Sequence, residues 1–169
     1  MSQSSRTGFA RAADERVDWV HNLPFLAVHL VPLFAIVTGV TPFDVALCVG
    51  LYVVRMFCIT AGYHRYFSHR AYKMGRVMQF LMAFGGATAA QKGPLWWAAH
   101  HRHHHKFSDT PDDTHSPLKG FWWSHVGWIV CRKYRATNFE AIKDFAKYPE
   151  LRWLNEHYLV PPAMLAVTC

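Results

Sequence analysis

Apolar residues gather in long uninterrupted stretches along this chain instead of alternating with polar residues. The first stretch covers residues 22–40 without a charged side chain, and the second covers residues 45–62 with Arg55 as its single charge. At about 1.5 Å per residue, a helix of this length approaches the ~30 Å thickness of a membrane's hydrocarbon core. Thr41–Asp44 forms a turn between them. The pattern predicts a hairpin of two membrane-spanning helices, and the alternative is a buried hairpin in a soluble helical bundle.

The rest of the chain also has the pattern of an all-α protein. Residues 76–91 form a third apolar stretch of marginal length, which histidines flank on both sides. If those histidines share one site, the stretch cannot cross the membrane once, and two crossings need about 40 residues. We therefore expect an interfacial or re-entrant segment. Apolar sequence resumes from about residue 159 and runs to residue 169, so the predicted third membrane segment is truncated.

Composition and charge agree with a membrane protein. Hydrophobic residues make up 51% of the chain and charged residues 17%, against roughly 25% in soluble domains. The net charge is +7, and the turn at residues 41–44 contains no Lys or Arg, so the positive-inside rule puts both ends of the hairpin in the cytoplasm. Residues 1–20 are expected to be a mobile cytoplasmic tail before a single domain at 21–169. A nucleic-acid binder would not need two apolar runs, so no nucleic-acid partner is expected.

Histidines form the most distinctive feature of the sequence. Five occur in the six positions from His100 to His105, and two more are His64 and His69. On a helix with 100° per residue, an HxxHH pattern puts three imidazoles within about 100°. Two registers fit this pattern, one beginning at His100 and one at His101. His64 and His69 lie about 140° apart on an ideal α-helix, so a bend or a helix end is expected between them.

The kind of metal follows from the surrounding residues. Residues 45–108 contain no Asp or Glu, which excludes a carboxylate-bridged site, calcium and magnesium in this region. Imidazole suits zinc, copper, iron and nickel, and five imidazoles exceed a four-coordinate zinc site. The four cysteines form no CxxC pair, which argues against an iron–sulfur cluster. Two histidine-bound metals beside a membrane suggest oxidation of a lipid.

Three segments carry a specific resemblance. Gly62–Arg70 (GYHRYFSHR), His101–Ser108 (HRHHHKFS) and Gly120–Trp128 (GFWWSHVGW) closely resemble the membrane fatty acyl desaturases. The nearest branch is the acyl-CoA Δ9, or stearoyl-CoA type, in a bacterial form, and the resemblance covers roughly residues 22–160. It selects the register that begins at His101.

The resemblance implies a di-iron oxygenase with cytosolic histidine boxes and N-terminus, in a bacterial inner membrane. Two electrons and O2 would remove two hydrogens from a saturated acyl-CoA or acyl-lipid chain, leaving a cis double bond and two waters. The electrons would come from a separate ferredoxin or cytochrome b5-type donor with its reductase. The implied iron ligands are His64, His69, His101, His104 and His105.

Other family positions carry over as substrate contacts. Gln91 and Trp97 match residues that line the acyl tunnel, and ordinary helix packing is the alternative for both. Arg132 and Lys133 match cations that hold coenzyme A phosphates, and the alternative is flanking charge at the cytoplasmic face. His115 and His125 match family histidines that support the ligands or have a structural role, and neither is expected to be a ligand.

Two departures from the family pattern matter. Ala99-His100 replaces the basic–acidic pair of the acyl-CoA enzymes, which favours a phospholipid as the acyl carrier. The family's third box, of the Asn-x-x-His-His type, does not occur in these residues, so the second iron is expected to need ligands beyond residue 169. The chain is accordingly interpreted as an N-terminal fragment that is inactive alone.

Two other functions use similar residues. A membrane hydroxylase of lipids or alkanes shares histidine boxes, but the HRYFSHR and GFWWSHVGW contexts count against it. A metal sensor or transporter would need ionisable groups inside its spans, and Arg55 has the wrong sign for a cation path.

Overall fold

The computed structural model describes residues 11–20 and 22–169, and these residues are helical apart from turns and one isolated bridge between Val17 and Cys131. The all-α expectation is confirmed for this part of the chain. The helices are α1 (Leu23–Val28), η1 (Val31–Phe34), α2 (Ala35–Thr38), α3 (Pro42–Phe57), η2 (Cys58–Ser68), α4 (Arg76–Ala87), α5 (Pro94–Phe107), η3 (Pro117–Lys119), η4 (Trp123–Gly127), η5 (Arg132–Tyr134), η6 (Glu140–Ile142), α6 (Lys143–Ala146), α7 (Pro149–Glu156) and α8 (Val160–Thr168). They form two compact units, residues 1–31 with 103–136 (unit 1) and residues 32–102 with 137–169 (unit 2).

The first apolar stretch differs from the single helix expected at 22–40. It is divided into α1, η1 and α2, with turn residues at 29–30. Pro32 lies in η1 and has no backbone N–H to donate to the preceding turn, which favours an interruption there. Gly39 ends α2 with φ of 77°, a conformation that suits glycine.

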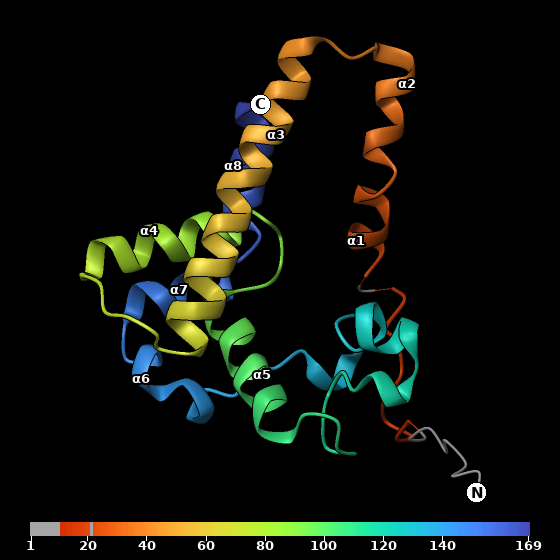
Figure 1. The fold of residues 1–169 in the computed structure, drawn as a ribbon. Helices are drawn as coiled ribbons and strands as arrows, with labels where there is room; N and C mark the ends of the chain where they lie inside the picture. Colours follow the sequence, from red (N-terminus) through yellow and green to blue (C-terminus); the bar gives the residue numbers. More distant parts are fainter. Residues whose placement is uncertain (1–10, 21) are drawn as a thin grey trace, which may run out of the picture. The chain divides into compact units, whose positions relative to one another are not determined.

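The second apolar stretch forms a longer helix than the predicted 45–62. Pro42–Ser68 spans 27 residues and is, among the described residues, the one helix long and apolar enough to cross a membrane. Figure 1 shows α3 and η2 as one continuous helix. Thr41 and Asp44 start it with a capping box, in which the Asp44 carboxylate accepts from Thr41 N at 2.8 Å. Arg55 donates its Nε to Leu51 O at 3.1 Å within the helix.

The core of unit 2 forms where η2, α4 and α5 meet. Figure 1 shows α4 running crosswise to α3. Tyr63 and Phe67 of η2 are fully buried, as are Leu95 of α5 and Leu151 of α7. Gly86 of α4 allows the Tyr63 ring to come close, because a Cβ at Gly86 would lie 2.4 Å from Tyr63 Cε1.

The peripheral segments of unit 2 follow the apolar pattern in part. One face of α4 is buried while Val77, Met78 and Leu81 on its other face are exposed, as an interfacial helix requires. Its place in the membrane interface stays a prediction. Two short helices, η6 and α6, cover residues 140–146, and α8 lies within the apolar stretch expected from about residue 159.

Part of the predicted mobile tail is held in place within unit 1. Glu15 is buried and accepts hydrogen bonds from Lys119 Nζ at 2.9 Å and from the Tyr134 hydroxyl. Burial alone raises the pKa of Glu15, but these hydrogen bonds outweigh it and hold the pKa below its ordinary value. A buried, paired carboxylate fixes the chain at that point, so residues 11–20 are not a free tail. Residues 1–10 of the predicted tail lie outside the described residues.

Candidate metal centre

His64 and His69 are brought together by an unusual helix. Residues Cys58–Ser68 form a π-helix, and His69 N donates to His64 O, five residues earlier, at 3.1 Å. This bonding pattern places residues five apart on the same side of the helix, whereas an α-helix separates them by about 140°. The two Nε2 atoms consequently lie 3.1 Å apart. The expected helix end is present at Ser68, and the wider turn, which was not predicted, aligns the rings.

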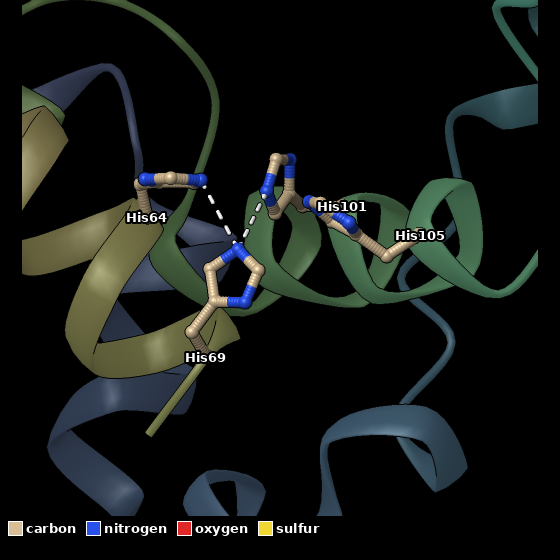
Figure 2. A group of neighbouring side chains, drawn as sticks. All are labelled: His64, His69, His101 and His105. Carbon is tan, nitrogen blue, oxygen red and sulfur yellow. Dashed lines mark hydrogen bonds between the residues drawn. The ribbon is translucent and has the colours of Figure 1, made fainter. Parts of the chain in front are cut away.

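His101 completes this arrangement from α5. Its Nε2 lies 3.3 Å from His69 Nε2, and its ring centroid lies 4.7 Å from that of His64. Asn155 of α7 helps to position α5, because its Oδ1 accepts from Trp96 N at 2.8 Å. Trp96 N is one of the first-turn N–H groups that have no acceptor inside their own helix. Figure 2 shows His69 between His64 and His101, with the three rings turned toward one another.

His105 belongs to the same group. It lies on α5 one helical turn after His101, and the continuous helix places it there although the boundary between the two units falls within α5. The ligand nitrogens of His64, His69, His101 and His105 all lie within 4.8 Å of one another. We call these four residues the imidazole cluster. Four of the five predicted ligands are thus brought together.

The cluster fits a transition metal. A metal–nitrogen bond of about 2.1 Å separates neighbouring ligands by about 3.0 to 3.4 Å in octahedral or tetrahedral geometry. The two measured Nε2 separations, 3.1 and 3.3 Å, fall within that range. No carboxylate belongs to the cluster, so the donor set suits iron, zinc or copper and not calcium or magnesium.

Arg102 holds the two histidine segments in register. Its guanidinium donates to the last carbonyls of η2, Phe67 O at 2.6 Å and Ser68 O at 3.1 Å. It also donates to Ala141 O at 3.0 Å and to both carboxylate oxygens of Asp144 at 2.9 and 3.0 Å. Burial raises the pKa of Asp144, but the hydrogen bonds from Arg102 outweigh it and leave that pKa below its ordinary value. We call these contacts the Arg102 brace.

His104, the fifth predicted ligand, lies in a second group within unit 1. Its Nδ1 donates to Asp113 Oδ1 at 3.0 Å, and its ring stacks on His115 with centroids 4.0 Å apart. Burial raises the pKa of Asp113, but hydrogen bonds from His104 and from two backbone N–H groups outweigh it and lower that pKa. Burial and the neighbouring His104 lower the pKa of His115. We call His104, Asp113 and His115 the His–Asp stack.

The remaining histidines have other contacts. His100 is buried, and its Nδ1 donates to Trp96 O at 2.9 Å. His103 Nε2 donates to Asp112 O at 2.9 Å, and His125 Nδ1 donates to Phe121 O at 2.9 Å. Within the second histidine run, it is therefore His101 and His105 that lie beside His64 and His69.

The four predicted substrate residues differ in their surroundings. Trp97 is half-buried and stacks on His101, with ring centroids 4.7 Å apart. Gln91 is exposed in the bend before α5. Arg132 is exposed in η5, and Lys133 beside it forms an ion pair with Asp14 at 2.9 Å.

Three residues around the site were not predicted from the sequence, namely Arg102, Asp113 and Asp144. Arg102 and Asp144 are 42 positions apart, and the pairing depends on the fold. Asp113 lies among three acidic residues of the loop after the histidine run, which offered a local signal, but only burial distinguishes it from Asp109 and Asp112.

Comparison with known proteins agrees with this site. The family profile described as "Fatty acid desaturase" matches residues 41–168. A palmitoyl-monogalactosyldiacylglycerol delta-7 desaturase of Arabidopsis thaliana is 37% identical over 151 residues, which cover 84% of this chain and 39% of the relative. An sn-1 stearoyl-lipid 9-desaturase of Anabaena variabilis is 32% identical over 89% of this chain and 56% of its own length. A probable acyl-CoA desaturase of Schizosaccharomyces pombe is 31% identical over 89% of this chain and 32% of its own length.

The chain thus spans between about a third and somewhat more than half the length of these relatives. The matched region contains the π-helix, α5 and the Arg102 brace, and it includes all four residues of the imidazole cluster. The chain belongs to the fatty acid desaturase family.

Proposed function

We propose that this chain belongs to an O2-dependent desaturase that introduces a cis double bond, at Δ9, into a saturated acyl chain. The observation that carries the proposal is the convergence of three Nε2 atoms, 3.1 and 3.3 Å apart, in a cluster without carboxylates. Such a donor set suits iron, zinc or copper and not calcium or magnesium. Membership of the fatty acid desaturase family supports iron as that metal.

The protein's own residues would hold and shield the metal. The imidazole cluster supplies four nitrogens, and the Arg102 brace keeps His69 beside His101. Trp97 covers one face of His101 and so limits the access of water. Bound iron would supply the activation of O2 that removal of two unactivated hydrogens requires. We propose two irons, the second held by His104 and by ligands beyond residue 169.

The acyl chain would arrive on a lipid or on coenzyme A. Two of the relatives are named for lipid-linked chains and one for acyl-CoA. Ala99-His100 favours the lipid, while Arg132 and Lys133 are candidate phosphate contacts for coenzyme A. Lys133 is paired with Asp14, so a phosphate would have to compete with that carboxylate.

The helix Pro42–Ser68 would anchor the protein in a bacterial inner membrane. Its η2 end carries His64 and would face the cytoplasm together with the N-terminus. Gln91 and Trp97 would line the acyl tunnel. Electrons would come from a separate ferredoxin or cytochrome b5-type protein with its reductase.

The test is to express the full-length protein in a bacterial host fed perdeuterated stearic acid. Mass spectrometry of the extracted lipids should show monounsaturated chains that have lost two deuterons, and only in aerated cultures. His101→Ala should abolish the product, while His103→Ala, which changes a histidine outside the imidazole cluster, should retain it. Hydroxylated chains would instead identify a hydroxylase. Equal product from wild type and His101→Ala would contradict the proposed centre.

A further inference from the structure

The His–Asp stack admits two interpretations. Its three side chains place possible ligand atoms within 4.8 Å of one another, as a metal site would. Alternatively, Asp113 and His115 hold the His104 ring so that His104 alone ligates a metal. The two interpretations differ in the partners expected for the Asp113 oxygens and in the expected orientation of the His104 and His115 rings.

The Asp113 carboxylate is already occupied by N–H donors. Oδ1 accepts from His104 Nδ1 at 3.0 Å and from His115 N at 3.1 Å, and Oδ2 accepts from Asp109 N at 3.3 Å. The side chain is completely buried. Three of the roughly four lone-pair sites of this carboxylate are thus taken by N–H donors. Asp113 therefore suits the role of a hydrogen-bond acceptor better than that of a metal ligand, because at most one site remains for a cation.

The orientation of the rings also argues against a shared metal. The His104 and His115 rings are 4.0 Å apart and inclined by only 24°. A ring-nitrogen lone pair lies in the plane of its ring, so two nearly parallel rings direct their lone pairs side by side and not to one point. In the imidazole cluster, the His64 and His69 rings are instead inclined by 81°.

The tautomer of His104 follows from its acceptor. A carboxylate only accepts, so His104 Nδ1 must carry the proton, and in the neutral ring Nε2 is then the nitrogen with the lone pair. Ligating histidines commonly donate their other nitrogen to a carboxylate, which fixes the ring and raises its basicity. We propose that Asp113 is a positioning residue that presents His104 Nε2 to a metal, and that the His–Asp stack is not itself a metal site. This inference rests on the proposed iron-dependent function.

The surroundings of Asp113 make it rigid enough for this role. His115 is held between His104 and Trp128, whose ring centroid lies 4.9 Å away. Trp123 Nε1 donates to Thr114 O at 3.0 Å, which ties the loop to η4. Each of these contacts lies within unit 1, so the loop, the stack and the His104 ring form one packed assembly.

The test compares Asp113→Asn with Asp112→Asn in the full-length protein in detergent. Both variants remove one negative charge from the same loop, but Asp112 is exposed and its side chain is not part of the stack. We measure cobalt(II) affinity by chelator competition and the visible spectrum of the bound cobalt. Asp113→Asn should weaken one class of bound metal by on the order of ten- to a hundredfold and change its spectrum, while Asp112→Asn should match wild type.

The His104→Ala background separates positioning from ligation. If Asp113 acts through His104, Asp113→Asn should cause no further loss of metal in that background. Further loss there would identify Asp113 as a ligand and overturn the inference, as would wild-type affinity and spectrum in Asp113→Asn alone. A wild-type protein that binds no metal would instead contradict the proposed function, so the two failures are distinguishable.

Discussion

The imidazole cluster and the His–Asp stack both place ligand-type atoms within 4.8 Å, yet they are built differently. The cluster joins residues as far apart in sequence as His69 and His101, and its rings turn their nitrogens toward a common point. The stack lies within twelve residues, its rings are nearly parallel, and a buried carboxylate takes the hydrogen bonds. Convergence of lone pairs, and not proximity of the residues, is therefore the geometric feature that distinguishes the imidazole cluster from the His–Asp stack.

The two groups also differ in how the protein holds them. The cluster depends on a long-range contact, because Arg102 of α5 binds the carbonyls that precede His69. The stack is held by its own loop, through the backbone N–H groups of Asp109 and His115. Damage to distant packing should consequently affect the cluster first.

The largest effect is expected from removing a nitrogen of the cluster. His69→Ala removes the imidazole between His64 and His101, and loss of the bound metal together with activity should follow. His157→Ala is the matched control, because this exposed histidine donates to Trp153 O and lies outside both groups. Iron content by inductively coupled plasma mass spectrometry checks the prediction. Full iron in His69→Ala would show that the cluster does not hold the metal.

A smaller effect is expected from the Arg102 brace. Arg102→Ala leaves two carbonyls of η2 and the Asp144 carboxylate without their guanidinium partner, and should cost about 2 to 4 kcal/mol. Arg76→Ala removes an ion pair with Glu150 whose arginine is 62% exposed, and should destabilise the fold far less, because exposed ion pairs contribute little. The midpoint of thermal unfolding in detergent separates the two. Equal shifts would mean that the brace behaves as an ordinary surface pair.

The same brace should make stability depend on pH. Since hydrogen bonds lower the folded-state pKa of Asp144 below its ordinary value of 3.8, its charge stabilises the fold above that value. This contribution is lost as the pH falls through the lower folded-state pKa. The difference in unfolding midpoint between wild type and Asp144→Asn should therefore be present at pH 7 and shrink below about pH 3.8. A difference that stayed constant from pH 7 to below pH 3.8 would contradict the prediction.

Much of this architecture could be predicted from the sequence because hydrophobic periodicity is local. The helical class and the helix beginning at Pro94 follow from pattern and from proline at a first helical position. The first apolar stretch was predicted as one helix, although Pro32, which favours the observed interruption at residues 29–30, is visible in the sequence. The tail was predicted mobile because its charges are visible in sequence, whereas the partners of Glu15 lie more than 100 positions away.

The candidate site was predictable in residue type and not in geometry. The spacing of His64 and His69 indicated a shared role but suggested rings about 140° apart, because the π-helical turn has no simple sequence signature. The grouping of His104 with Asp113 depends on a loop that folds back on α5, which helical periodicity does not describe. Long-range partners such as Asp144 could not be predicted from the sequence for the same reason.

The smallest effect, and the sharpest distinction between the two groups, is expected from His115→Phe. Phenylalanine keeps an aromatic ring between His104 and Trp128 but has no nitrogen. If His115 only stacks, cobalt(II) affinity should change by less than about tenfold, while His115→Ala, which removes the ring, should weaken it more. The matched change in the imidazole cluster, His64→Phe, should abolish binding at that cluster because a converging nitrogen is lost. If His115→Phe proved as damaging as His64→Phe, the nitrogen of His115 would be a ligand and the two groups would be metal sites of the same kind.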